Sequence, residues 1–599
     1  MTRTLICSLL CFFASASNAQ SFSNPYPQGY FRWPVNLRPE IVANLGELRP
    51  NHWHMGLDVR TGGHENEPVY AAADGYIAFI GIRPSSFGRF IIINHPNGLS
   101  TLYGHLNTFA PAIEAWVTEQ QYQQQSWAVE LKPAAGLLPV KQGDFISYSG
   151  NTGGSQGPHV HFEIRSTSTD ECLNPLLFGF DLKDYVSPVI QQIALYDRSK
   201  SIYSSGRPQA YAAKLTDSGY NIPRMPVLET KLSVIGVGLK AFDRITGSAN
   251  QDGIYSAYLY VDDELISGFR LDSISYDETG YYNAHVDYKN NYNGGVEYQL
   301  LNALPNDRSG VYIKNGDGLI HLTDTIPHIV RLDVKDAYQN TAVMTFPIRL
   351  TELPSVTPEV AGLKLLPGKT FTVTRPGFEA ELREENLFDT LDLHYSSVTG
   401  TAISAVHTLN DVSVPVQGLL KVRLQPIVEP AASVRDKVVI VRQGGRSANI
   451  RKAVWEGKWA TAEFGDFGKF TAVADLTPPV INAPGKGDTI NLSASKRLAF
   501  TPTDASGIKS FHAEIDGQWI RFTNDKSRTW IYYFDERVPY GVHELMVRVE
   551  DIAGNITQRN WWFKRLPYTP PPPRKKGVKK KTAIEKKTSS TRKAVKKKK

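Results

Sequence analysis

The sequence predicts a mostly β protein, with a small antiparallel β-sheet core followed by several β-sandwich modules and a disordered basic tail. Its 599 residues exceed what one hydrophobic core usually organises, so several domains are expected. The chain contains 28 Tyr, 26 Phe and 10 Trp together with 47 Gly and 37 Pro, a composition that favours short strands joined by turns. An apolar content of 41% is sufficient for packed cores.

Residues 1–19 have the features of a secretory signal peptide. Arg3 supplies the positive start, 5–13 is a short apolar run, and Ala19 is the small residue that a signal peptidase requires. The apolar run is too short to span a bilayer, and no later segment is long enough to form a transmembrane span. A buried N-terminal strand is the alternative. We therefore expect an exported protein, either periplasmic or secreted in the bacterial envelope.

The cysteines agree with export. Cys7 and Cys11 would leave with the signal peptide, and Cys172 is then alone. The mature chain can form no internal disulfide, so large β cores must stabilise it.

The first predicted domain covers 20–186. Its expected strands lie in 68–81, around a turn at Asp74-Gly75, and at 90–94 and 99–106, joined by a hairpin turn at 96–98. The polar segment at about 110–138 is predicted to be an insertion, part helix and part strand, that forms either a rim of the site or a surface loop without a role.

The domain is expected to close with two further strands. These are 140–148 and 159–165, separated by the loop Gly150-Asn-Thr-Gly-Gly-Ser-Gln-Gly157. So many glycines in one loop indicate close approach of backbones.

Three β modules are predicted to follow, at 187–350, 351–475 and 476–566. The first and last are expected to be immunoglobulin-like sandwiches, because Asp336-Ala-Tyr-Gln-Asn340 and Asp551-Ile-Ala-Gly-Asn555 each place an aspartate and a turn after a strand. The middle module is β-rich but carries no signature of its own. Thr477-Pro-Pro479 is a candidate linker.

The segment 567–599 is predicted to be a disordered Pro- and Lys-rich tail. Residues 574–599 contain fourteen Lys and Arg against Glu585, a charge of +13. The whole chain carries +7, which leaves −6 for the rest. Such a tail could bind an anionic envelope polymer or lipid headgroups, or have no fixed partner. It lacks interleaved aromatic residues, so no specific nucleic-acid binding is expected.

Seven of the fourteen histidines lie in 52–165. Side chains two or four residues apart share a face of an extended segment, so His54 with Asp58, and His159 with His161, could each lie on one face. Two imidazoles and one carboxylate form a catalytic zinc set with an open fourth position. We expect one Zn²⁺ bound by His54, Asp58 and His161, because oxygen-only sites suit calcium and magnesium better.

His105 and His159 complete the candidate site. Both lie outside the ligand set but are expected on the same face, where they could move protons and stabilise an oxyanion. HxH or HxxxD alone is a weak signal, and their combination in this order is stronger.

The region 46–165 resembles the lysostaphin/LytM-type zinc metallopeptidases, which are peptidoglycan endopeptidases with a small antiparallel β core. The matching phrases are His54-Met-Gly-Leu-Asp58, Val69-Tyr-Ala-Ala-Ala-Asp-Gly75, Tyr103-Gly-His-Leu106, Gly150-Asn-Thr-Gly-Gly154 and Gly157-Pro-His-Val-His-Phe-Glu163. The resemblance covers about a fifth of the chain. It implies zinc binding by His54, Asp58 and His161, with His105 and His159 as the catalytic pair.

Some residues do not fit that pattern directly. The segment between His105 and His159 is longer than in the shortest family members. Asn44 could be proposed as an inhibitory fourth ligand, although its position gives little support. His52 could assist the site or lie on the surface, and His64 and His95 are expected to be structural.

Three functions compete at this point. The first is an exported zinc metalloendopeptidase that hydrolyses peptide cross-links of peptidoglycan. The second is a non-catalytic LytM-like regulator of other cell-wall hydrolases, which the complete ligand set disfavours. The third is an envelope scaffold or adhesin in which the β modules do most of the work.

Overall fold

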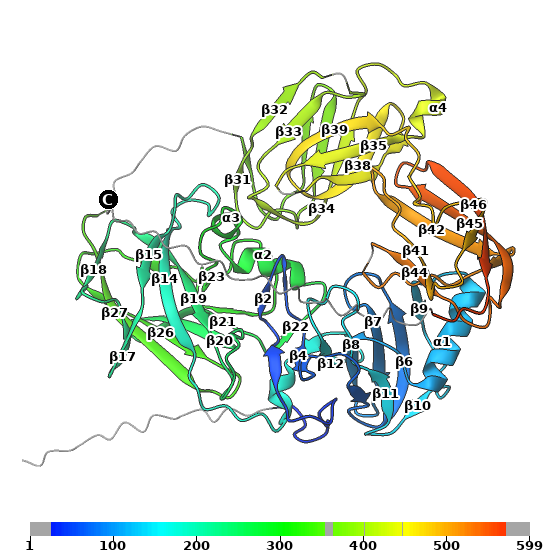
Figure 1. Ribbon diagram of the computed structural model, residues 1–599. Coiled ribbons are helices and arrows are strands. Elements are labelled where there is room, and N and C mark those ends of the chain that lie inside the picture. Colours follow the sequence, from blue (N-terminus) through cyan, green and yellow to red (C-terminus); the bar gives the residue numbers. More distant parts are fainter. Residues whose placement is uncertain (1–24, 354–362, 401, 446, 527, 571–599) are drawn as a thin grey trace, which may run out of the picture.

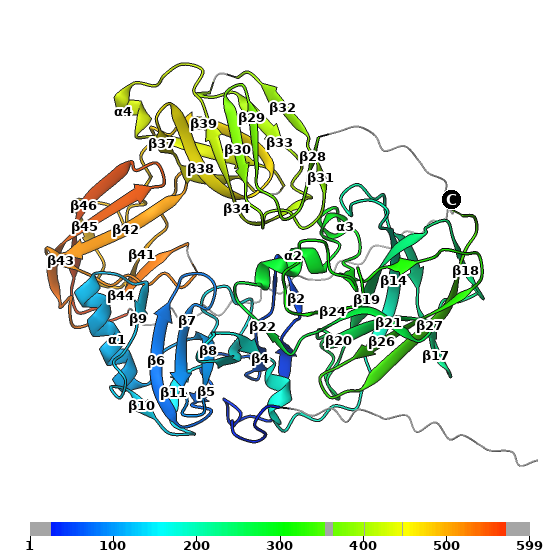
Figure 2. The ribbon, with the colours of Figure 1, turned by 180° about the vertical axis from the view of Figure 1, so that it is seen from behind.

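The computed structural model describes residues 25–353, 363–400, 402–445, 447–526 and 528–570. We describe the chain in the units that the sequence predicts: first (25–186), second (187–353), third (363–475) and fourth (476–566). Figure 1 shows them arranged as a ring, and Figure 2 shows the same ring from behind. The predicted mostly β fold class is confirmed. The predicted signal peptide, 1–19, and the tail beyond 570 lie outside the described residues.

The first unit is built on one antiparallel sheet. Its main path runs β1 (Ile41–Ala43), β4 (Leu57–Arg60), β12 (His159–Ser166), β8 (Leu99–Leu106), β7 (Arg89–Asn94), β6 (Gly75–Ile82) and β10 (Pro139–Val140). Off this path, β9 (Val129–Leu131) pairs with β6, and β13 (Cys172–Leu173) pairs with β12. The 3₁₀ helix η1 (Pro175–Phe178) follows β13.

Most of the expected strands of this unit are present. The predicted hairpin is β7 and β8, joined through Gly98, whose φ of 80° favours glycine. The single strand predicted at 140–148 is instead two strands, β10 and β11 (Phe145–Tyr148). They separate because the Asp144 carboxylate accepts a hydrogen bond from the Lys141 N–H at 2.7 Å and closes a turn.

Two small two-stranded sheets complete the unit. The strands β5 (Pro68–Tyr70) and β6 do not pair with each other across the Asp74-Gly75 turn, because β5 pairs with β11. The strands β2 (Leu48–Arg49) and β3 (His52–Trp53) form a separate hairpin. The β2–β3 hairpin leads directly into His54.

The segment 110–138 holds one helix and the strand β9. The helix, α1 (Pro111–Gln124), begins with a proline at its first turn, where the missing N–H costs no intrahelical bond. Ile113, Val117 and Gln121 are its buried residues and recur every four positions, so they face the sheet together. Among the described residues α1 is the longest helix, and none has the length and apolar character needed to cross a membrane.

Two sheets make up the second unit. One contains β15 (Gln209–Ala212), β14 (Val189–Asp197), β19 (Val234–Phe242), β23 (Gln299–Leu300) and β25 (Ile320–His321). The other contains β16 (Lys214–Thr216), β17 (Gly219–Asn221), β18 (Leu228–Thr230), β27 (Thr341–Leu350), β26 (His328–Lys335), β20 (Ser256–Val261), β21 (Glu264–Arg270) and β24 (Tyr312–Lys314). Short elements connect them: β22 (Ser273–Ile274), η2 (Thr279–Tyr281), α2 (Tyr282–His285) and α3 (Tyr288–Tyr292).

The third unit also has two five-stranded sheets. They are β29 (Phe371–Arg375), β30 (Phe378–Leu382), β34 (Pro415–Leu424), β38 (Trp459–Asp466) and β37 (Val454–Glu456), and β32 (Tyr395–Val398), β33 (Val406–Leu409), β39 (Gly468–Ala474), β35 (Val438–Gln443) and β36 (Asn449–Lys452). The pair β28 (Lys364–Leu365) and β31 (Leu391–Asp392) and the helix α4 (Ala432–Arg435) lie outside these sheets.

The fourth unit has a five-stranded sheet and a smaller pair. The larger sheet contains β40 (Thr489–Asn491), β46 (Ile556–Arg565), β45 (Gly541–Asp551), β42 (Ile508–Ile515) and β43 (Gln518–Trp519), and the pair is β41 (Arg497–Phe500) with β44 (Trp530–Tyr533). Burial alternates along β45, as expected for a strand with one face on a core.

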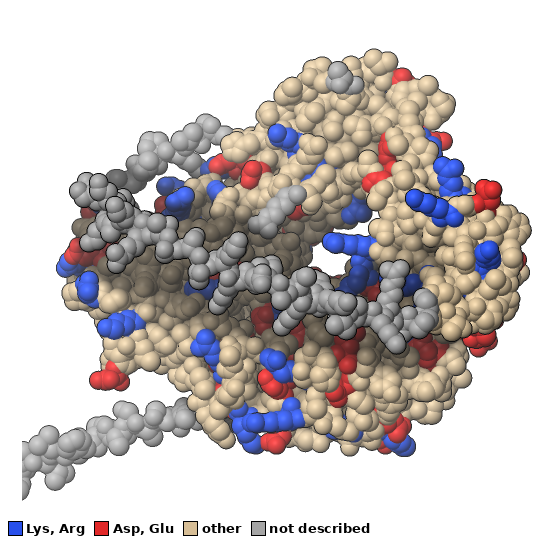
Figure 3. All heavy atoms as spheres, in the orientation of Figure 1, with Lys and Arg blue, Asp and Glu red and all other residues tan. Residues whose placement is uncertain are grey.

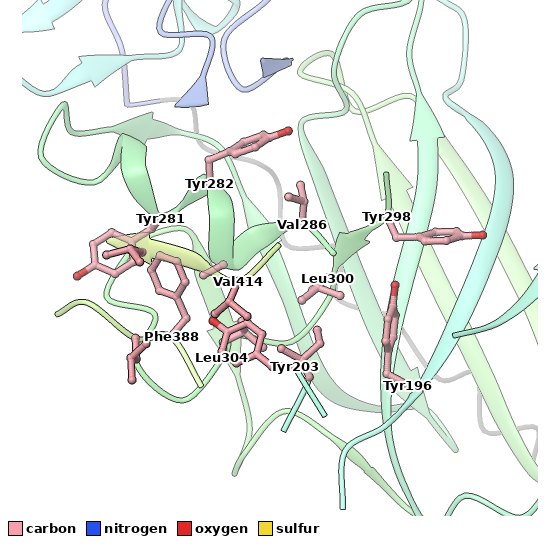
Figure 4. Close-up of a cluster of buried hydrophobic side chains, with 14 of the residues drawn as sticks. Tyr196, Tyr203, Tyr281, Tyr282, Val286, Tyr298, Leu300, Leu304, Phe388 and Val414 are labelled. Atoms are coloured by element: carbon pink, nitrogen blue, oxygen red, sulfur yellow. The ribbon is translucent and has the colours of Figure 1, made fainter. Parts of the chain in front are cut away.

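The hydrophobic core of the second unit continues into its neighbours. Figure 4 shows aromatic and aliphatic side chains gathered where the second and third units meet, including Tyr281 and Phe388, whose ring centroids are 5.8 Å apart. Trp53 of the first unit is fully buried, with its ring centroid 5.4 Å from that of His285. Shared apolar burial therefore joins the first three units.

Polar contacts close the ring between the fourth unit and the first. The Arg521 guanidinium donates to the Gln121 side chain of α1 at 2.8 Å, and the Lys526 ammonium donates to the Ser155 carbonyl at 2.9 Å. Tyr122 and Trp519 add an edge-to-face ring contact at 5.0 Å. The space-filling view in Figure 3 shows an opening through the ring, bordered in places by Lys and Arg side chains.

These contacts predict that the ring can be opened by substitution. An Arg521→Met, Lys526→Met variant lacks both positively charged side chains. The free energy that favours the closed ring should fall by about 1–2 kcal/mol, because polar pairs near the surface contribute about 0.2–1 kcal/mol each. The open fraction should rise roughly tenfold. Small-angle X-ray scattering of the mature protein should then report a larger radius of gyration. The exposed Arg548→Met is the matched control and should scatter like the wild type; equal curves for all three proteins would contradict the account.

Candidate metal centre

Three potential ligand atoms converge in the first unit. Asp58 Oδ1 lies 2.9 Å from His54 Nε2 and 3.0 Å from His161 Nδ1, and the two nitrogens are 3.0 Å apart. The three residues form a group that could hold a metal ion. They are 7%, 7% and 4% exposed, so the group lies below the surface.

Strand pairing places two of these residues together. Asp58 on β4 and His161 on β12 are direct partners in the antiparallel register, which brings their side chains close. His54 lies outside any strand, between β3 and β4. The segment from His54 to Asp58 is therefore not one extended strand, and a bend before β4 brings the two side chains together instead.

The His54 ring is oriented by the backbone of Asn44. Its Nδ1–H donates to the Asn44 carbonyl at 2.8 Å, which leaves the Nε2 lone pair facing Asp58. The Asn44 side chain points to the second unit, where it donates to the Gly253 carbonyl and accepts from the Gly253 N–H. Asn44 thus positions His54 through its carbonyl, and its amide is engaged elsewhere than at the metal group.

The His161 ring is held by a buried carboxylate. Its Nε2 lies 2.8 Å from Glu163 Oε1, so that nitrogen carries the proton and Nδ1 faces the ligand group. Glu163 is itself fully buried and accepts hydrogen bonds from Arg165 and from Tyr276 of the second unit. Burial alone would raise the pKa of Glu163, but Arg165 and His161 lower it to about 2.

The other ionisable groups respond to the same cluster. Burial lowers the pKa of His54. Burial acts against ionised Asp58, but His54, His159 and His161 hold the pKa of that carboxyl well below its usual range. Burial would also lower the pKa of His161, yet its hydrogen bonds to Asp58 and Glu163 raise the pKa to about 9. A positive charge is therefore favoured among these groups, either as a proton on His161 or as a bound cation in its place.

The donor set fits a divalent metal ion. With Nδ1 of His54 donating to Asn44 and Nε2 of His161 donating to Glu163, loss of the second proton of His161 leaves two nitrogen lone pairs and a carboxylate oxygen at the centre. Three acceptors that face one another need a positive charge between them. Two neutral imidazoles and one carboxylate are also the ligands of three-residue catalytic metal sites.

His105 and His159 lie beside this group. Their ring centroids are 4.8 Å apart, and His159 Nε2 is 3.3 Å from Asp58 Oδ1. Each Nδ1 is hydrogen-bonded to a carbonyl of the glycine-rich loop, His105 to Thr152 at 2.9 Å and His159 to Gly157 at 2.8 Å. Burial lowers the pKa of His105 to about 3, so this imidazole is neutral near pH 7.

The loop that carries these carbonyls is tightly packed. A Cβ at Gly150 would lie 2.7 Å from the His105 carbonyl, and one at Gly153 would lie 2.2 Å from the Gly88 nitrogen. The expected close backbone approach is therefore confirmed. His105 itself has a φ of 59°, an uncommon value for a residue with a side chain, and its N–H donates to Phe87.

The remaining histidines of this region lie apart from the ligand atoms. His52 is exposed and bonds the Pro50 carbonyl, and His64 is exposed. His95 is buried, with its two ring nitrogens bonded to the Asp74 carbonyl and the Thr101 hydroxyl. The structure thus satisfies these three without using them in the metal group.

Sequence reasoning missed the residues that support the ligands. Glu163 could have been found, because it stands two residues after His161 on the same strand and so shares its face. Arg49, whose guanidinium donates to Asp58 Oδ2 at 3.3 Å, and Tyr276 carry no such signal. Tyr276 in particular lies more than a hundred residues away, and only the fold brings it to Glu163.

A large cavity lies away from this group, between the first and fourth units. It has a volume of about 970 Å³ between α1, Phe145 and Tyr148 on one side and Glu536 and Arg537 of the fourth unit on the other. None of the five candidate site residues lines it. This cavity is therefore separate from the metal group.

Comparison with known proteins supports the resemblance for this part of the chain. Residues 52–123 match the family model of peptidase family M23, and residues 365–475 match that of a Zu5-like domain. The first match includes His54, Asp58 and His105 and ends before His159 and His161. The predicted LytM-type resemblance is confirmed, and the second match gives the third unit the signature that sequence reasoning did not find.

Three curated relatives each match about a quarter of the chain. The cell division protein DipM of Caulobacter vibrioides is 31% identical over 24% of this chain and 19% of its own length. The DD-carboxypeptidase/endopeptidase Mpg of Neisseria meningitidis serogroup B is 33% identical over 22% of this chain and 26% of its own. The murein hydrolase activator NlpD of Salmonella dublin is 29% identical over 27% of this chain and 34% of its own. The chain thus spans between 19% and 34% of the length of each.

The role assigned to Glu163 can be tested through metal affinity. A Glu163→Gln variant keeps the side-chain size but removes the charge that orients His161, so affinity for a divalent metal should fall about 10–100-fold. Competition with a chromogenic chelator measures this loss. Tyr276→Phe, which removes one hydrogen bond, should show a smaller loss in the same direction.

The control for this experiment is Glu130→Gln, at the one exposed position of strand β9. It removes a carboxylate that pairs with Arg83 and should leave metal affinity unchanged. Thermal unfolding of each variant verifies that it is folded. Affinity within twofold of the wild type for folded Glu163→Gln would show that this carboxylate does not support the ligand.

Proposed function

We propose that the chain is an exported zinc metalloendopeptidase that hydrolyses peptide cross-links of bacterial peptidoglycan. The observation that carries the proposal is the arrangement of the metal group with two adjacent, loop-oriented histidines. Three ligand atoms meet at His54, Asp58 and His161, and two further imidazoles stand beside them. This is a catalytic rather than a closed structural pattern, because three protein ligands leave a coordination position for water or substrate.

Zinc is the metal that the donor set favours. Imidazole nitrogens with one carboxylate suit Zn²⁺ better than the oxygen-seeking Ca²⁺ and Mg²⁺. When bound, Zn²⁺ polarises a carbonyl group and lowers the pKa of water to near 7. The ligands would bring one negative charge, so the centre stays electrophilic.

The chain's own residues would handle the protons. The neutral His105 ring donates through Nδ1 to Thr152, so its Nε2 lone pair can take a proton from the attacking water. The His159 ring likewise donates through Nδ1 to the Gly157 carbonyl, and its Nε2 lies beside Asp58. Both rings are thus fixed in orientation and present the nitrogen that can exchange a proton with substrate.

The proposed substrate and location are supported by observations outside the metal group. The apolar segment that begins the chain has the pattern of a signal peptide, and peptidoglycan lies outside the cytoplasmic membrane. The names of the relatives refer to cell division, to peptidase activity and to murein hydrolase activation. The basic tail could add affinity for an anionic envelope polymer or for lipid headgroups.

A second candidate is a non-catalytic regulator of other cell-wall hydrolases. The burial of the metal group favours it, because the second unit bonds Glu163 through Tyr276 and the fourth unit contacts the loop that holds both histidines. The similarity to a murein hydrolase activator points the same way. A scaffold or adhesin role for the β-rich units is compatible with either function.

Digestion of purified peptidoglycan tests the proposal. Mature protein should bind about one zinc per chain and release new amino groups from peptidoglycan. His105→Ala should keep its zinc but lose roughly 10²–10⁴-fold in rate, because only proton transfer is removed. His161→Ala should lose zinc and activity together. His64→Ala, an exposed histidine outside the group, is the matched control and should behave like the wild type.

The alternative outcomes separate the candidates. Zinc binding with no digestion, together with stimulation of a separate cell-wall hydrolase, would replace the enzyme by the regulator. Digestion that survives in His161→Ala would show that the metal group is not the active site.

A further inference from the structure

Four aspartates are buried together where the first unit passes into the second. Asp184 lies in the segment before β14, Asp243 follows β19, Asp336 follows β26, and Asp252 lies in the loop before β20. They are only 5%, 3%, 2% and 2% exposed. Asp184, Asp243 and Asp336 each offer an oxygen within 4.8 Å of the others.

Several of these carboxylate oxygens have no protein partner. Buried Oδ2 of Asp184, Oδ1 of Asp243 and both side-chain oxygens of Asp252 make no hydrogen bond. Within the described ranges, no Lys, Arg or His forms an ion pair with any of the four residues. An unpaired buried carboxylate is costly, and here several face one another.

The electrostatics agree with this geometry. Burial, helped by the charge of Asp336, raises the pKa of Asp243 to about 8. The ionised form of Asp243 is thus disfavoured as long as protein groups alone surround it. A cation would remove the mutual repulsion.

The spacing suits one calcium ion. Ca²⁺ binds six to eight oxygens at about 2.3–2.6 Å, so two ligands of one ion can be up to roughly 5 Å apart. Oxygens within 4.8 Å of one another meet that limit. The site offers only oxygens, which disfavours zinc, and its several carboxylates exceed the one or two that Mg²⁺ usually takes.

We infer that Asp184, Asp243 and Asp336, with Asp252 beside them, form a Ca²⁺ site at the junction of the first and second units. This site is separate from the metal group of His54 and does not depend on peptidase activity. The bound ion ties the segment that leaves the first unit to the ends of two strands of the second. It therefore fixes how the second unit, which supplies Tyr276, sits against the first.

The same construction recurs at the entrance to the fourth unit. Asn340 donates its N–H and its amide to the two oxygens of Asp336, and Asn555 does the same to Asp551. Asp475, Asp504 and Asp551 form a matching but less buried group. The recurrence of Asp336-Ala-Tyr-Gln-Asn340 and Asp551-Ile-Ala-Gly-Asn555 in the sequence thus corresponds to a repeated spatial arrangement.

Calorimetric titration with Ca²⁺ tests the inference. Mature protein is freed of divalent ions on a chelating resin, given back one equivalent of Zn²⁺, and titrated with CaCl₂. The wild type should bind Ca²⁺ at millimolar or lower concentration. Asp243→Asn should bind one Ca²⁺ fewer per chain, or bind that ion at least tenfold more weakly. Asp217→Asn, an exposed aspartate in the turn between β16 and β17, should match the wild type.

Thermal unfolding keeps the test decisive. Without Ca²⁺, Asp243→Asn should unfold at the same or a higher temperature than the wild type, since a neutral amide replaces a buried carboxyl group whose ionised form is disfavoured there. With Ca²⁺, the wild type should gain more in melting temperature than the variant. No Ca²⁺ binding by the wild type, tighter binding of Mg²⁺ than of Ca²⁺, or full Ca²⁺ stoichiometry and affinity in Asp243→Asn would each overturn the inference.

Discussion

The convergence of three acceptor atoms is the constraint on which the site depends. His54 Nε2, Asp58 Oδ1 and His161 Nδ1 lie about as close as hydrogen-bonded atoms, yet the outer bonds of both rings use their N–H groups elsewhere. Without those outer bonds, either ring could turn and donate to Asp58, which would satisfy the carboxylate without a metal. The Asn44 carbonyl and Glu163 therefore orient the neutral forms of both rings so that their lone pairs face Asp58, an arrangement that suits a cation.

The later units contribute to this constraint from far along the chain. The second unit holds Asn44 through Gly253 and Glu163 through Tyr276, and the fourth unit holds the histidine-orienting loop through Lys526. The closed ring of four units thus connects the residues that hold the metal group with the loop that orients His105 and His159. We infer that movement of either unit would alter the site without any change in the ligands themselves.

Many of the strands and site residues of the first unit could be predicted from the sequence, because short motifs reflect local structure and chemistry. The spacing of His159 and His161 places them on one strand face, and Pro96-Asn-Gly98 fixes the β7–β8 hairpin. The juxtaposition of Asp58 and His161 depends on strand register, and that of Tyr276 and Glu163 depends on packing between units. Neither leaves a local pattern, since contacts over long separations arise only when the chain is folded. The buried aspartates were visible in part, as the repeated Asp–Asn phrase, but their charge environment was not.

The most direct test of the account is the anomalous scattering of a zinc-loaded crystal at the zinc edge. The account predicts one strong peak bonded by His54 Nε2, Asp58 and His161 Nδ1 at about 2.0–2.2 Å. Nδ1 of His54 should still donate to Asn44, and Nε2 of His161 should still donate to Glu163. A peak bonded to Nε2 of His161, or the lack of any peak between these three residues, would contradict the claim that the outer hydrogen bonds select the metal-binding nitrogens.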